Sequence, residues 1–83
     1  MNYFKEYDVV QVTILDRPNR HVDGTEGVKR LPQIGDLGTI VHVYPGAQDM
    51  SPAYIVECVD QNGFTVWLAD FTIGELELVE VAK

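Results

Sequence analysis

Ile34-Gly35-Asp36-Leu37-Gly38-Thr39-Ile40-Val41-His42-Val43-Tyr44 is the stretch that decides the fold of this chain of 83 residues. Gly35 and Gly38 flank an aspartate, and glycine adopts a positive φ or admits a neighbouring backbone at no steric cost, so this part predicts a tight turn. Five of the six residues after Gly38 are β-branched or aromatic, which favours a strand. Pro45-Gly46 then ends it. The stretch therefore predicts a turn that leads into a β-strand.

A second strand is predicted before this stretch, within residues 8–15. There Val10, Val12 and Ile14 alternate with their neighbours at a period of two, so we expect these three side chains to face inward. Asp16-Arg17-Pro18-Asn19 then ends the strand, because proline and turn-forming residues disfavour its continuation.

Three more strands are predicted after it. Residues 53–59 and 64–71 are joined by Asp60-Gln61-Asn62-Gly63, in which Asn-Gly is a strong hairpin signal. Residues 72–75 predict a single turn, of 3₁₀ type, before a last strand at 76–81, which turns Leu76, Leu78 and either Val79 or Val81 inward. Five short strands with turn signals between them and no helix predict an all-β fold, a small five-stranded SH3-like barrel.

Residues 16–33 form a long polar connection between the first two strands. Connections of 18 residues are uncommon inside a compact domain and are usually functional or mobile. Four of the six basic residues lie here: Arg17, Arg20, Lys29 and Arg30. The connection is therefore a candidate binding loop.

Length and composition predict one domain over residues 1–83. The N-terminus lacks a basic segment followed by an apolar run, and no apolar stretch approaches the ~20 residues that span a bilayer. The single cysteine, Cys58, excludes an internal disulfide. We therefore expect a cytoplasmic protein without membrane association.

The net charge of −7 is unevenly distributed. Residues 1–30 hold five acidic and five basic residues, whereas residues 31–83 hold eight acidic residues and one basic residue, Lys83. Such a field aids solubility, repels phosphate backbones and favours basic partners.

The strand and turn motifs resemble a family of small bacterial domains of unknown function. The family pattern reads roughly YDVV, GDxGTVVxVY, YxVEFxD and GxT, and the matching segments here are residues 7–10, 35–44, 54–60 and 63–65. The resemblance implies an SH3-like barrel whose members are often stand-alone proteins, some on mobile elements or near toxin–antitoxin genes. It implies no reaction and no catalytic residues. The chain departs from the pattern at Cys58, where the family usually has Phe, and in the length of the 16–33 connection.

Catalytic chemistry finds little support in the sequence. Cys58 with His42 or His21 would be a nucleophile–base pair, but Cys58 lies within an apolar run beside acidic neighbours, where free cysteine behaves as a small hydrophobic residue. His21, Asp23 and Glu26 could surround a cation or small ligand, yet their spacing matches no known ligand pattern. We expect no enzyme, no cofactor and no bound metal.

Two neighbouring strands are apolar on both faces, at residues 55–56 and 58–59 and at residues 66–69. We therefore expect their outer face to be covered by a second subunit, by the long loop or by a partner protein. The residues that we expect to contact a partner are Ile55, Val59, Trp67 and Tyr44, with Arg17, Arg20 and Arg30 of the loop.

The predicted function is that of a non-enzymatic module that binds a protein, with a basic partner favoured by charge, in an accessory, immunity or antitoxin-type role. One alternative is a nucleic-acid-binding barrel that uses the 16–33 loop. The acids interleaved in that loop and its lack of aromatic residues argue against it. A second alternative is a small-ligand or metal-binding domain, or an enzyme that is assembled only as an oligomer. A homodimer formed through the 54–59 and 64–69 hairpin is a separate prediction.

Overall fold

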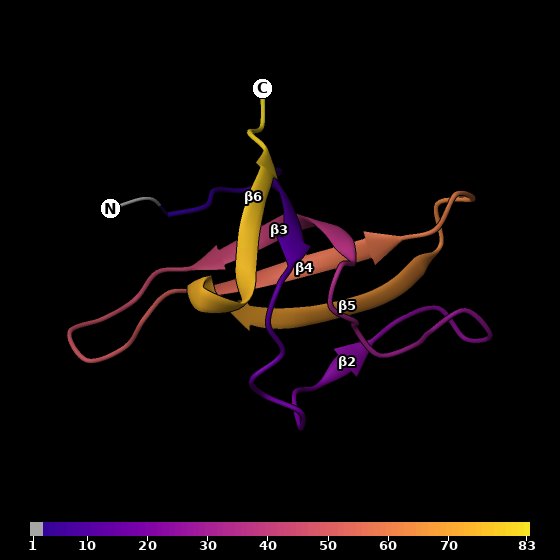
Figure 1. Ribbon diagram of the computed structural model, residues 1–83, viewed down its shortest axis with the longest axis horizontal. Coiled ribbons are helices and arrows are strands. Elements are labelled where there is room, and N and C mark those ends of the chain that lie inside the picture. Colours follow the sequence, from indigo (N-terminus) through magenta and orange to yellow (C-terminus); the bar gives the residue numbers. More distant parts are fainter. Residues whose placement is uncertain (1–2) are drawn as a thin grey trace.

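The computed structural model describes residues 3–83, which form six antiparallel strands in one sheet (Figure 1). The strands are β1 (Val9–Val12), β2 (Val22–Asp23), β3 (Leu37–Tyr44), β4 (Ala53–Val59), β5 (Thr65–Thr72) and β6 (Leu76–Glu80). Their order in the sheet is β2-β5-β4-β3-β1-β6, and a single 3₁₀ turn, η1 (Ile73–Glu75), separates β5 from β6. Nowhere in residues 3–83 is there a helix long and apolar enough to cross a membrane.

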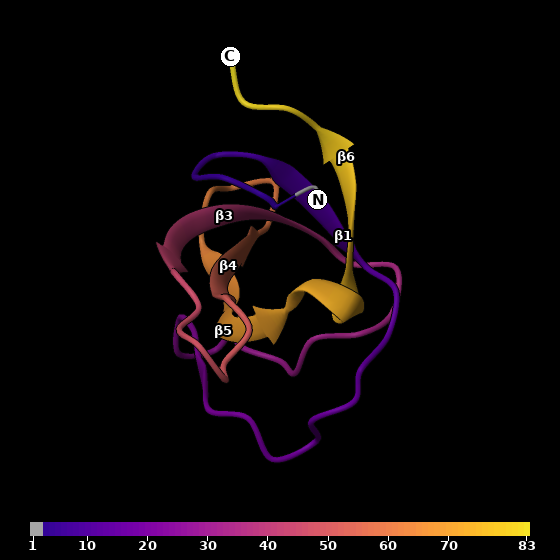
Figure 2. The same ribbon diagram turned by 90° about the vertical axis from the view of Figure 1, so that its left-hand side faces the viewer.

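The predicted all-β class is confirmed, and the sheet curls around a common interior as a small barrel does (Figure 2). The five longer strands are neighbours in the order β5-β4-β3-β1-β6, with the 3₁₀ turn before the last strand of the chain. The predicted count of five strands is wrong by one. The extra strand, β2, lies inside the 16–33 connection and pairs with β5 through Val22↔Ala69 and Asp23↔Leu68.

The two glycines of the fold-deciding stretch have different roles. Gly35 has a φ of 98°, the left-handed conformation that the turn requires. At Gly38, a Cβ atom would lie 2.5 Å from Val56 Cγ1 and 3.0 Å from the Glu57 carbonyl oxygen of the neighbouring strand. Gly35 therefore shapes the turn, and Gly38 lets β3 and β4 approach each other.

The core consists of inward-facing residues from all six strands. Val10 and Val12 are buried as predicted, but Ile14 is 51% exposed because β1 ends at Val12 and the alternation stops there. Leu76 is buried as predicted. Leu78 lies opposite the buried Val10 but is exposed, against prediction, because β6 is an edge strand and no further strand of residues 3–83 covers its outer side; Val79 and Val81 are exposed as well. The largest fully buried apolar side chains are Trp67, Tyr54, Phe71, Ile40, Val10, Val12 and Val56.

A β-bulge in β5 determines which side chains of this strand enter the core. Cys58 is opposite Trp67 but Val59 is opposite Thr65, so Val66 is an extra residue in β5. Val66 and Trp67 are both buried as a result. The bulge therefore shifts the alternation and directs the following residue, Leu68, to the outer face of the sheet.

Candidate functional site

Two arginines fasten the 16–33 connection to β5 and η1. Arg20 donates through Nη2 to the Glu75 carboxylate and through Nη1 to the Asp70 carbonyl oxygen at 2.8 Å. Arg17 Nη2 donates to Asp70 Oδ2 at 2.7 Å. The Arg20 guanidinium also lies 4.3 Å from the centre of the Phe71 ring, which adds a cation–π contact. The side chain of Arg20 is buried, so this residue holds the fold together.

Glu75 is the fully buried centre of this network. Besides Arg20, it accepts hydrogen bonds from the backbone amides of Asp16 at 3.1 Å and Thr72 at 3.0 Å. Burial by itself raises the pKa of Glu75, but the hydrogen bonds from Arg20 and the two amides outweigh it and hold the pKa below its ordinary value. The carboxylate is therefore ionised at neutral pH and ties the start of the connection to η1.

Asp36, in the fold-deciding stretch, organises a second network. It accepts from the indole Nε1 of Trp67 at 2.8 Å, from the Gln33 amide at 2.9 Å, and from two Arg30 nitrogens at 2.7 and 3.0 Å. Burial opposes ionisation, but these donors keep the pKa of Asp36 below its ordinary value, and Asp36 in turn raises the pKa of Arg30. Asp36 thus joins the end of the long connection to the tryptophan of the core.

A groove of about 320 Å³ lies on the outer face of the sheet, over β2, β5 and β4. The strand register creates it, because Asp23 lies opposite Leu68, Ile55 opposite Asp70, and Tyr44 opposite Ala53. Ile55, Leu68 and Ala53 give it an apolar floor that is half-buried in the free chain. Tyr44, which is exposed and packs edge-on against His42, lies at one side. The remaining lining residues are His21, Asp23, Ala69 and Asp70.

The charged residues around this groove are mainly acidic. The Asp23 side chain is exposed, and its carboxylate lies 3.0 Å from the ring nitrogen Nε2 of His21. Asp70 is paired with Arg17. Glu57 is opposite Leu68 on the same face and accepts from the Thr65 hydroxyl. The arrangement suits an apolar side chain on the floor with a cationic group beside Asp23.

The side chains that could perform chemistry are not assembled for it. Burial raises the pKa of the Cys58 thiol, and the nearby Asp36 carboxylate raises it further, so the thiol is neutral near pH 7. His21 contacts Asp23, but within residues 3–83 no group of three or more His, Cys, Asp or Glu side chains is arranged to hold a metal ion.

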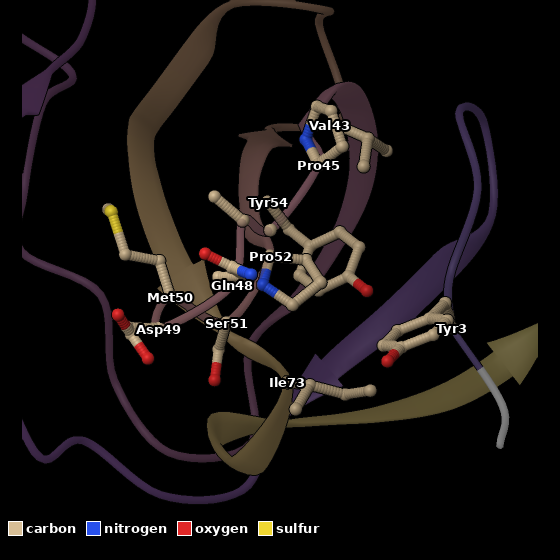
Figure 3. Close-up of a pocket in the computed structure, with 12 residues that line it drawn as sticks. Tyr3, Val43, Pro45, Gln48, Asp49, Met50, Ser51, Pro52, Tyr54 and Ile73 are labelled. Atoms are coloured by element: carbon tan, nitrogen blue, oxygen red, sulfur yellow. The ribbon is translucent and has the colours of Figure 1, made fainter.

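A larger cavity of about 880 Å³ lies between the β3–β4 loop, residues 45–52, and η1 (Figure 3). Its walls are mainly apolar and include Pro45, Pro52 and Ile73, with Tyr3 at one side. Tyr54 also lines this cavity, and its hydroxyl is buried. Burial raises the pKa of the Tyr54 hydroxyl, and the backbone of Phe4 lowers this pKa by a smaller amount. In the sequence, Pro45-Gly46 indicated the end of the strand but gave no sign of a cavity.

Of the seven residues that were expected to contact a partner, three lie in or beside the groove and four lie elsewhere. Ile55 and Tyr44 line the groove, and Arg17 reaches its edge through Asp70. The other four lie elsewhere: Trp67 is a core residue with no exposed surface, Arg20 is buried against Glu75, Arg30 is paired with Asp36, and Val59 is exposed at the far end of β4.

Sequence reasoning missed Leu68, Ala53 and Asp70 as groove residues. The apolar run at 66–69 was the available signal, but assigning its faces requires the bulge at Val66. The long connection, one of the three covers considered, lies along the edge of β5, where Arg30 N donates to the Val66 carbonyl oxygen at 3.2 Å.

Comparison of the chain with protein-family models, with curated proteins and with solved structures found no match. The resemblance to the family of small bacterial domains therefore stays a prediction.

Proposed function

We propose that this protein is a non-enzymatic binding module that holds a segment of a basic partner protein in the groove on the outer face of β2, β5 and β4. The observation that carries the proposal is the apolar floor of Ile55 and Leu68 beside the exposed carboxylate of Asp23. An apolar centre with a charged rim is the usual composition of a protein-binding surface.

The rigidity of the groove supports this proposal. Its floor residues lie on strands, and the connection that carries His21 and Asp23 is held by the buried pair of Arg20 and Glu75. A surface that is already ordered loses little conformational entropy when a partner binds. The net charge of −7 would also accelerate the approach of a cationic protein.

The pairing of the loop arginines favours a protein partner over a nucleic acid. Arg17 is paired with Asp70, Arg20 with Glu75 and Arg30 with Asp36. Because a carboxylate neutralises each of these three cations, Lys29 is the one basic residue of residues 16–33 whose charge is left for phosphate groups. An accessory, immunity or antitoxin-type role, in which a small acidic protein masks a basic effector, follows from this proposal.

Capture from a lysate of the native host tests the proposal. The tagged chain is compared with Ile55→Lys and with the control Val59→Lys, which places the same charge on the same strand outside the groove. Circular dichroism and thermal unfolding first establish that both variants are folded.

We expect one stoichiometric protein that survives nuclease treatment, is lost with Ile55→Lys and is retained with Val59→Lys. A nuclease-sensitive mixture would contradict the proposal in favour of nucleic-acid binding. Capture of this chain alone would indicate the homodimer, and equal capture by both variants would place binding outside the groove.

A further inference from the structure

The two outer edges of the sheet differ in what covers them. Along β5, the carbonyl oxygens of Thr65 and Val66 accept hydrogen bonds from the amides of Thr25 and Arg30, at 2.9 and 3.2 Å. The side chains of Arg17 and Arg20 both donate to the Asp70 carbonyl oxygen. The strand β2 pairs with the middle of β5. At the opposite edge, β6 pairs with β1 and with no other strand of residues 3–83 (Figures 1 and 2).

On the side away from β1, the backbone of β6 faces no other strand of residues 3–83, so its N–H and C=O groups on that side are open to strand pairing. Val12 N donates to the Asp36 carbonyl oxygen at 2.9 Å and Gly35 N donates to the Val12 carbonyl oxygen at 2.8 Å, which directs the backbone groups of Val12 away from β6. Because these groups alternate in direction along a strand, those of Gln11 point to β6, and those of Glu77, opposite Gln11, point to β1. The N–H and C=O of Leu78 therefore point away from β1, toward solvent.

The side chains around this edge are apolar and acidic. Leu78, Val79 and Val81 are 43%, 52% and 53% exposed. Glu77 and Glu80 lie among them and are also exposed. An open strand edge with exposed aliphatic residues is a template for an added strand.

The charges decide between the possible occupants of the edge. A second copy of this chain would bring the Glu77 and Glu80 carboxylates of both copies into one seam, and each chain carries a net charge of −7. Like charges facing each other across paired strands are unfavourable. Lysine or arginine side chains on the added strand would instead face these carboxylates.

We infer that β6 accepts an extended, basic segment of a partner protein as an added strand, with hydrogen bonds to Leu78 and cationic side chains beside Glu77 and Glu80. The inference rests on the proposed function in that the partner is a basic protein. It assigns a second surface, on a different strand from the groove.

Photo-crosslinking in the native host tests the inference. A photoreactive benzoylphenylalanine replaces Val79 in the full chain, and mass spectrometry identifies the segment that it captures. Leu78→Pro removes the N–H that points to solvent and leaves the bonds to β1, so an edge strand tolerates it. Leu78→Thr, which keeps that N–H, is the matched control, and thermal unfolding establishes that both variants fold.

We expect a cross-link to a lysine- or arginine-rich segment of another protein. Leu78→Pro should reduce it by about tenfold, as the loss of one backbone hydrogen bond predicts, and Leu78→Thr should preserve it. A cross-link to a second copy, a captured segment without cationic residues, no cross-link, or equal yields from both variants would each overturn the inference.

The two proposals fail separately. If Ile55→Lys abolishes capture from the lysate while Leu78→Pro does not change the cross-link, the groove is the binding site and the inference about β6 is wrong. If Leu78→Pro abolishes the cross-link while Ile55→Lys still captures the partner, the edge binds and the groove does not.

Discussion

Replacing Glu75 by glutamine tests whether the buried ion pair holds the 16–33 connection in place. Glu75 is fully buried, and the Arg20 side chain opposite it is only 4% exposed. Glutamine keeps the shape of the side chain but leaves the Arg20 cation in the interior facing a neutral amide. The Arg20 side chain would keep its hydrogen bonds to the carbonyl oxygens of Arg17 and Asp70.

The cost of this change is large for a domain of this size. Removing one partner of a buried ion pair costs about 3–5 kcal/mol, and we take about 3 kcal/mol because the carbonyl contacts of Arg20 stay. A domain of this length has a total unfolding free energy of roughly 4–12 kcal/mol. The midpoint of thermal unfolding should fall by roughly 12–24 °C. Urea titration followed by circular dichroism measures the free energy, and the exposed control Glu77→Gln should change it by less than about 0.5 kcal/mol.

The pH dependence of the Glu75→Gln effect provides a second readout. The pKa of Glu75 is lower in the folded chain than in the unfolded chain. Its contribution is therefore complete above the unfolded pKa of about 4.3 and is lost as the pH falls through the lower folded value. The difference between wild type and Glu75→Gln should be full at pH 7 and shrink below about pH 4. A difference under about 1 kcal/mol at pH 7, or one that stays constant into acid, would refute the reasoning.

Two substitutions and one labelling experiment test other parts of the structure. Asp36→Asn should lower the free energy of unfolding by about 2 kcal/mol and alter the fluorescence of Trp67, the sole tryptophan, because it weakens the acceptor of the indole N–H. An unchanged spectrum and an unchanged stability would contradict this expectation. Gly38→Ala should lower the free energy of unfolding, measured by urea titration, by about 1–3 kcal/mol. Gly74→Ala, whose Cβ would meet no atom within 4 Å, should lower it by less than about 0.5 kcal/mol. Equal effects would refute the close approach of β3 and β4. Cys58 should react with iodoacetamide at pH 8 only in denaturant, since burial raises the pKa of its thiol, and rapid labelling of the native protein would show that it is accessible.

The strands could be predicted because their signals are local. Residues 53–59 were predicted as a strand and form β4 with those bounds, since the apolar alternation there is bracketed by turn residues. The 3₁₀ turn before the last strand was also anticipated, within one residue. The strand β2 could not be predicted, because its two residues are strand-like only through pairing with β5.

The candidate site could be predicted only in part, because it depends on long-range contacts. The bulge at Val66 sends Trp67 into the core and Leu68 to the outer face, and one extra residue in a strand leaves no local signature. The buried position of Arg20 depends on Glu75, which lies 55 positions later in the chain. A basic loop therefore suggested a binding surface, whereas the fold uses its arginines for internal ion pairs.

Mapping the captured partner onto the labelled chain by nuclear magnetic resonance tests the central claim most directly. The ¹⁵N-labelled protein is titrated with the purified partner, and the amide shifts are followed residue by residue. The account predicts that the largest perturbations fall on Tyr44, Ile55 and Leu68 in the groove, with the far end of β4 at Val59 little changed. Perturbations confined to residues 45–52 around the larger cavity, or to Val59 and the hairpin beside it, would contradict it.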